Sequence, residues 1–145
     1  MSRDPDDPHL DLVEALGAVA FAVMGALTKL AAERDLSLTQ IRMIGLLRDR
    51  QLTISELALV LGLDRSSVSG LVDRTEKRGL VRREPNPADA RSVHVTLSSS
   101  GHEAFAAGAT EMAATLSSLT DALSPAEAVR LTTLLERMLE HRGLR

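Results

Sequence analysis

The sequence has 145 residues, a formal net charge of -3 and no cysteine. This length is typical of one domain, or of two small lobes that share a core, and the lack of cysteine excludes disulfides, thiolate metal sites and cysteine-based redox sensing. A weakly acidic chain has no overall attraction for a polyanion, so a surface for nucleic acid has to be sought in the local charge.

The first segment, MSRDPDDPHLDL, is acidic, whereas a signal peptide starts with basic residues. With the lack of cysteine, this predicts a cytoplasmic protein. A first helix is predicted over residues 10–34. Its most apolar window, Ala15–Leu27, has 13 residues, and a bilayer span needs about 20. We therefore expect no membrane contact and interpret this helix as a dimerisation helix, with a core helix of a monomer as the alternative.

Capping residues predict three further helices. Ser37 and Gln40 have the spacing of a capping box before a helix that runs to about residue 48. Thr53 and Glu56 have the same spacing before a short helix that ends near residue 61. Asp64 is placed to cap a fourth helix that ends near residue 78, and glycines at positions 62 and 79 end the last two of these helices.

The pattern then changes to that of a β-hairpin. Residues 80–84 and 92–97 flank the turn-forming sequence PNPADAR, and apolar and polar residues alternate in the second segment. Val93, Val95 and Leu97 are expected to face the core. Ser98 is placed to cap a fifth helix that runs to about residue 122, and the sequence SPAE at 124–127 starts a sixth that runs to about residue 141. The fold class is therefore mainly α with a small β-hairpin.

Residues 54–71 have the spacing of a helix-turn-helix. Ile54, Ala58, Gly62 and Val68 occupy the first, fifth, ninth and fifteenth positions, so a small residue lies at the helix crossing and a glycine in the turn. The apolar positions around them are filled by Leu57, Leu61, Leu63 and Leu71. An ordinary helical hairpin is the alternative.

The second helix of this unit has a slim outer face. Val68, Leu71 and Val72 are expected to face inward, with Thr75 near the boundary. Short side chains and a few long donors on the other side suit a helix that enters the DNA major groove. The candidate DNA contacts on this helix are Arg65, Ser66, Ser67, Ser69, Gly70, Asp73, Arg74 and Lys77. For Ser66 and Ser67, a capping role is the alternative.

Positive charge is concentrated in the same region. Residues 65–83 contain six basic and two acidic residues, a net charge of +4 in an acidic chain, and such a stripe is typical of phosphate binding. Arg91 is expected near the tip of the hairpin, where a guanidinium can enter a narrow minor groove. Asp89 would hold Arg91 or an arginine of the helix, or would only cap the turn. The candidate contacts of the hairpin are Arg82, Arg83, Asp89 and Arg91.

These residues resemble the MarR family of bacterial winged-helix regulators. The resemblance is carried by TISELALVLGLDRSSVSGLVDRTEKRGLVRRE, by DARSVHVTLS and by LSLTQIRMIGLL. It implies a winged helix-turn-helix with Arg65–Arg78 as the recognition helix and Arg91 as the arginine of the wing tip. One departure is Ala90, where many members have a second basic residue. Members that depend on cysteine are excluded, since the chain has none.

The resemblance also implies a homodimer that binds double-stranded DNA at a palindromic operator, more often as a repressor than as an activator. Residues 1–36 and 99–145 would form the helical dimerisation region, and residues 37–98 the DNA-binding domain. A small-molecule effector often binds such proteins in the crevice between the dimer helices and the DNA-binding lobes. With only two phenylalanines and no other aromatic residue, a pocket here would be lined by aliphatic side chains, with an arginine such as Arg42 for an acidic group.

Other classes of function are less well supported. No catalytic motif, phosphate-binding loop or cofactor motif is present, so we expect neither an enzyme nor a cofactor. A metal-responsive regulator is one alternative, because His94, His102 and Glu103 lie near one junction and would form a histidine–carboxylate site; surface histidines without a metal are the simpler interpretation. The other alternative is a winged helix that contacts only proteins.

Overall fold

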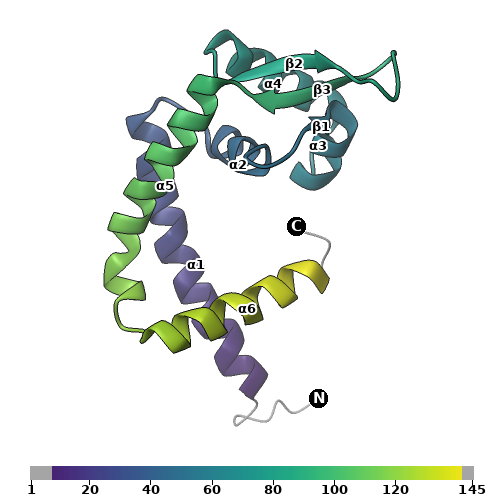
Figure 1. The fold of residues 1–145 in the computed structure, drawn as a ribbon. Coiled ribbons are helices and arrows are strands. Elements are labelled where there is room, and N and C mark those ends of the chain that lie inside the picture. The colour runs from purple at the N-terminus through teal and green to yellow at the C-terminus, as the bar shows by residue number, and fades with distance from the viewer. Residues whose placement is uncertain (1–7, 142–145) are drawn as a thin grey trace.

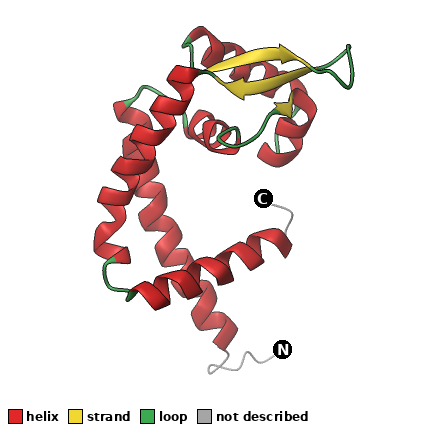
Figure 2. Cartoon of the chain, viewed as in Figure 1, coloured by secondary structure: helices red, strands yellow, loops and turns green. Residues whose placement is uncertain are grey.

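The computed structural model describes residues 8–141 and has the expected mainly α fold (Figures 1 and 2). A lobe of three helices and a small sheet lies at one end of a long pair of helices, and a last helix projects from the other end of that pair. In chain order the helices are α1 (Pro8–Glu33), α2 (Leu38–Leu46), α3 (Ile54–Leu61), α4 (Arg65–Lys77), α5 (Ser99–Thr120) and α6 (Pro125–His141), and the strands are β1 (Leu52–Thr53), β2 (Val81–Pro85) and β3 (Val93–Leu97).

The predicted caps are confirmed. Ser37 and Thr53 each accept a hydrogen bond from the backbone N–H of the third helical residue, and that residue's side chain accepts one in return. Asp64 caps α4 and Ser98 caps α5. The glycines at positions 62 and 79 have φ angles of 68° and 73°, the left-handed conformation in which a glycine ends a helix without strain.

The sheet has one strand more than the sequence predicts. Its order is β1-β3-β2 and both pairings are antiparallel, with Leu52 opposite Val95 on one side of β3 and Val81 opposite Leu97 on the other. β1 has only two residues, which is too short to produce an alternating pattern. The strand also ties the start of α3 to the middle of β3.

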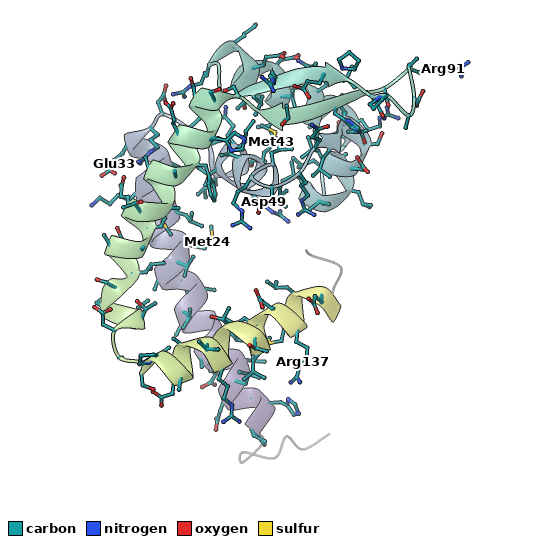
Figure 3. All side chains as sticks on the ribbon, in the orientation of Figure 1. Met24, Glu33, Met43, Asp49, Arg91 and Arg137 are labelled. Atoms are coloured by element: carbon teal, nitrogen blue, oxygen red, sulfur yellow. The ribbon has the colours of Figure 1, made fainter. Side chains whose placement is uncertain are left out.

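The hydrophobic core lies within the lobe. It combines side chains of α2, α3, α4, β2 and β3, and its fully buried members include Met43 (Figure 3), Leu57, Val68, Val72 and Val95. The inward positions predicted for the helix-turn-helix are therefore confirmed at Ala58, Val68, Leu71 and Val72.

Three predicted positions were wrong. Thr75 is fully buried and not at a boundary; its hydroxyl donates to the carbonyl of Leu71 at 2.8 Å and accepts from the amide of Gln40 at 3.0 Å, so both buried polar groups are satisfied. Val93 is 37% exposed, because it pairs with Pro85 where the hairpin extends past the core. Leu63 is 39% exposed in the turn between α3 and α4.

Helix α1 has nearly the predicted bounds, but its apolar stretch is longer than the 13-residue window. It has 26 residues, its mean hydropathy reaches 1.9 over an 18-residue window, and none of that window is buried within the chain. The estimate that it is too short to span a bilayer was therefore wrong, because flanking residues extend the apolar stretch. Length and composition alone do not distinguish a membrane span from a helix that packs against protein.

The first turn of α5 is pressed against the chain that follows α4. The backbone N–H of Ser98 donates to the carbonyl of Leu80 at 3.1 Å, and the Ser98 side chain donates to the carbonyl of Gly79 and accepts from the backbone N–H of Gly101 at 3.0 Å. A Cβ placed on Gly101 would lie 1.9 Å from the carbonyl oxygen of Leu80. Only glycine allows this approach, which fixes α5 to the C-terminal end of α4.

We predict that Gly101→Ala destabilises the protein by about 2 kcal/mol or more, because the backbone at Leu80 has to move to admit the methyl group. Gly108→Ala in the same helix is the matched control. Its Cβ would lie 3.6 Å from Leu30, an ordinary contact, and removing a helical glycine stabilises by roughly 0.5–1 kcal/mol. Urea unfolding of both variants measures their free energies of unfolding. Equal values would show that the contact between Gly101 and the carbonyl of Leu80 leaves room for a methyl group.

Candidate nucleic-acid interface

Helix α4 is divided lengthwise into a buried and an exposed face. Its apolar side and Thr75 pack into the core, and the remaining side chains face outward or lie at the edge. Ser69 and Gly70 are half-buried, whereas the other predicted contacts of this helix are exposed: Arg65, Ser66, Ser67, Asp73, Arg74 and Lys77. The predicted outward face is therefore present as one continuous strip.

The first turn of this strip is organised by Asp64. Its carboxylate accepts from the hydroxyl of Ser66 at 2.5 Å, and from the backbone N–H and the hydroxyl of Ser67 at 2.8 and 2.6 Å. These hydrogen bonds, the one from Ser66 foremost, hold the pKa of Asp64 well below its ordinary range. The capping role weighed for the two serines is thus present in the free protein. Each hydroxyl oxygen keeps lone pairs for a donor on DNA.

The basic residues fall into two groups. Three arginines already have partners: Arg78 donates to the backbone carbonyls of Arg34 and Asp35, and Arg82 lies 2.8 Å from the carboxylate of Glu84. The third, Arg83, pairs with Asp73 and Glu76. Between positions 65 and 91, four cations have no side-chain partner among the described residues: Arg65, Arg74, Lys77 and Arg91. These four are the charges of this region that are available to a polyanion.

Arg74 lies over Gly70. A Cβ on this glycine would be 3.4 Å from Nη1 of Arg74, one helical turn further along α4. The missing side chain leaves room for the guanidinium to lie against the helix backbone. A long donor is thereby available on an otherwise slim surface.

Arg83 on β2 bridges two acidic residues of α4. Its guanidinium lies 2.5 Å from the carboxylate of Asp73 and donates to that of Glu76, and its backbone N–H donates to Glu76 at 3.0 Å. Burial lowers the pKa of Arg83, but the hydrogen bonds to both carboxylates outweigh that effect and raise it overall, so the group stays charged. Asp73 and Arg83, both candidate DNA contacts, thus contact each other.

The turn between β2 and β3 is closed by its own hydrogen bonds. Asn86 donates from its side-chain amide to the hydroxyl of Ser92 at 2.7 Å, and the backbone N–H of Arg91 donates to the carboxylate of Asp89 at 2.9 Å. Of the two roles weighed for Asp89, the structure shows the turn cap and not a hold on an arginine side chain. Figure 3 shows Arg91 at the outer end of the hairpin, pointing away from the lobe.

The three residues of the metal hypothesis are not brought together in the described part of the chain. Within the described residues, no three histidine, aspartate or glutamate side chains lie close enough together to hold a metal ion. His94 is half-buried in the central strand, with no hydrogen-bond partner for its Nδ1, whereas His102 and Glu103 are exposed on α5. The proximity in sequence does not bring the three together, because the strand and the helix diverge after Ser98.

A cavity of about 590 Å³ lies between the lobe and the helix pair. Its walls come from α1, α2, α5 and the C-terminal end of α3, and the lining is apolar apart from Thr39 and two arginines, Arg34 and Arg42. Arg42 donates to the carbonyl of Val60 at 2.9 Å, and Arg34 lies 2.8 Å from the carboxylate of Glu111. The sequence indicated Arg42 but not Arg34, because its partner lies 77 residues further along the chain. Half-buried Phe105 is part of the same lining.

Comparisons with known proteins point to one family. Residues 34–92 match the sequence model of the MarR family. The chain is 36% identical over 72 residues to the HTH-type transcriptional regulator YfiV of Bacillus subtilis (strain 168), an alignment that spans 49% of this chain and 45% of that protein. It is 39% identical over 49 residues to the transcriptional repressor MprA of Escherichia coli (strain K12), spanning 34% of this chain and 28% of MprA. The chain thus aligns with less than half the length of these relatives.

The whole fold is matched by solved structures. The crystal structure of a mutant MarR from E. coli complexed with operator DNA has 25% sequence identity and a TM-score of 0.66, and the match covers 94% of this chain and 99% of that one.

We predict that the charge of Asp64 stabilises the protein in a pH-dependent way. Because the folded-state pKa is depressed, this contribution is present above the unfolded-state pKa of about 4 and is lost as the pH falls through the lower folded-state value. Asp64→Asn keeps a capping oxygen but no charge. Its melting temperature should be lower than that of the wild type at pH 7, and the difference should shrink towards pH 2. A difference that does not change with pH would contradict this role.

Proposed function

We propose that this protein, whose residues 34–92 match the MarR family model, is a winged-helix transcription regulator of that family: a sequence-specific DNA-binding protein that acts as a homodimer. The observation that carries the proposal is a group of four cations between positions 65 and 91 that have no side-chain partner among the described residues, three along the exposed face of α4 and one at the tip of the hairpin. The relatives and the fold are those of transcription regulators and not of enzymes.

In the proposed complex, α4 enters the major groove and the hairpin reaches the adjacent minor groove. The slim side chains of Ser69 and Gly70 let the helix backbone approach the base edges, and Arg74 is placed to bind guanine with two hydrogen bonds. Arg65 and Lys77 lie near the two ends of the same strip, where they would contact phosphates. The contacts predicted for Ser66, Ser67, Arg82 and Asp89 stay predictions, since their side chains have protein partners in the free protein.

We expect Arg74→Ala to weaken binding to the operator more than binding to random DNA. A bidentate base contact contributes roughly 1–3 kcal/mol of discrimination against the wrong base. Fluorescence anisotropy with the two duplexes measures both affinities, after the operator has been obtained by binding-site selection. Arg130→Ala, which removes the same charge from exposed α6, is the control. Equal losses on the two duplexes would mean that Arg74 contacts phosphates only.

Arg91 is predicted to read the width of the minor groove. Its side chain is exposed and has no protein partner among residues 8–141, so Arg91→Ala should leave the melting temperature nearly unchanged. In the minor groove, A·T and T·A pairs present the same acceptors, and a narrow A/T-rich stretch attracts a guanidinium. Selection of binding sites with both proteins should show that the variant loses its preference for A/T-rich flanks but keeps the base preference read by α4. An unchanged flank preference would exclude Arg91 from the groove.

The homodimer is supported by apolar surfaces that the chain itself leaves uncovered. Helix α6 exposes large apolar side chains along its length, and Phe21 on α1 is 81% exposed. Burying one such side chain contributes about 1.5–3 kcal/mol, which is enough, over several residues, to hold two subunits together. The exposed apolar side chains of α6 are Val129, Leu131, Leu134, Leu135, Met138 and Leu139. We therefore assign dimerisation to residues 1–36 and 99–145 and DNA binding to residues 37–98.

We predict that Leu135→Glu gives a monomer, because it places a charge in the apolar side of α6. Thr133→Glu is the matched control, since its spacing puts it on the opposite side of the helix. Light scattering at micromolar concentration should report a dimer for the wild type and for the control. A wild type that is monomeric at that concentration would refute the dimer.

Repression and release by a small molecule complete the proposal. The similarity to the repressor MprA supports repression over activation. The cavity beside α1, α2 and α5 has a volume within the range of small-molecule sites, which is roughly 300–1,000 Å³. Its apolar lining with Arg34 and Arg42 fits an apolar molecule with an acidic group.

The alternative function, a winged helix that contacts only proteins, would lack the steep salt dependence of phosphate binding. The cytoplasmic location is part of this proposal.

A further inference from the structure

We propose that Arg83 is a positioning residue that masks the negative charge of Asp73 and Glu76 from the DNA phosphates. This inference rests on the proposed function, because it concerns how the DNA-binding surface carries its charge. Arg83 is the only arginine among residues 8–141 that has ion pairs with two carboxylates. Both carboxylates lie on the helix that is expected to enter the major groove.

The cluster of Arg83, Asp73 and Glu76 lies where the proposed complex brings the protein close to the DNA backbone. Asp73 is exposed on the outward strip of α4, and Arg83 approaches it from the strand that leads into the hairpin. A helix in the major groove and a hairpin in the adjacent minor groove lie on either side of one sugar–phosphate strand. The junction of α4 and β2 therefore faces that strand, and an unmasked acidic residue there would repel it.

The charges show why a single arginine matters. Together the two carboxylates and the guanidinium have a charge of -1, and removal of the guanidinium would change it to -2. The side chain of Arg83 is only 27% exposed, and its donors already point at the two acids. Because the guanidinium is occupied and partly buried, its contribution to DNA binding is indirect. Arg65, Arg74 and Lys77 remain the direct contacts on α4.

A masking role, a direct phosphate contact and a purely structural role predict different results for three variants. Arg83→Lys keeps the charge, Arg83→Gln removes it, and a triple variant adds Asp73→Asn and Glu76→Gln to Arg83→Gln and so removes all three charges. Arg48→Gln is the matched control, since Arg48 pairs with Asp49 at 2.5 Å on α2's C-terminal side, away from α4 and the hairpin. Each affinity is measured by anisotropy on one fixed duplex of random sequence, at several salt concentrations.

Masking predicts that Arg83→Gln weakens binding roughly three- to thirtyfold at low salt, while Arg83→Lys and Arg48→Gln stay close to the wild type. The triple variant should bind at least as tightly as the wild type, with the same slope of log affinity against log salt. This recovery is the decisive result. The affinity of the triple variant can be measured even if Arg83→Gln alone fails to fold, because the triple variant has neither of the two carboxylates that Arg83 pairs with.

Three results would overturn the inference. If the triple variant folds but stays weak, and its salt slope falls by about 1, Arg83 contacts a phosphate directly. If the triple variant folds but stays weak with an unchanged slope, Arg83 has only a structural role at the hairpin. If Arg83→Gln binds like the wild type, the two acids do not affect the phosphates. A wild type that binds no DNA would instead refute the proposed function, so the two failures are distinguishable.

Discussion

The packing of one face of α4 against the rest of the lobe determines where each candidate DNA contact lies. Val68, Leu71 and Val72 fill the core, and the buried hydrogen bond between Gln40 and Thr75 fixes the rotation of the helix about its axis. A helix with apolar contacts alone can rotate or slide at little cost, whereas a buried amide that loses its partner costs about 1–3 kcal/mol. With the buried face fixed, Arg65, Arg74 and Lys77 have to face outward.

The same surface shows how an acidic protein presents positive charge. The net charge of the chain is -3, and acidic residues occur beside the basic ones on α4 and β2. Ion pairs tie Arg82 to Glu84, and Arg83 to Asp73 and Glu76. The acids that would repel a phosphate are thereby paired, and the cations without partners are those on the outer strip and at the hairpin tip. Which charges are paired matters more for such a surface than the sum of the charges.

Local features of the fold could be predicted from the sequence, and features that depend on distant residues could not. Caps at Ser37, Thr53, Asp64 and Ser98 depend on residues two to four positions away, and all four are confirmed. The helix-turn-helix is likewise a pattern within one short stretch. Strand β1 was missed because a two-residue strand is defined only by its partner.

In the candidate site, too, local features could be predicted from the sequence and contacts between distant residues could not. The outward strip of α4 follows from helical periodicity, and it appears as predicted. The bridge from Arg83 to Asp73 and Glu76 depends on the approach of β2 to α4, and the pair of Arg34 with Glu111 joins residues 77 apart. Thr75 was placed at a boundary because a threonine in a helix gives no sign of a buried partner such as Gln40.

Two of the connections between the lobe and the long helices lie near the C-terminal end of α4. On one side, the first turn of α5 is locked against Leu80 by the close approach of Gly101. On the other, Arg78 donates to the carbonyls of Arg34 and Asp35 at the end of α1. In the proposed dimer, the distance between the two recognition helices would therefore follow the arrangement of α1 and α5. Because Arg34 also lines the cavity, a molecule bound there would act directly on one of these two connections.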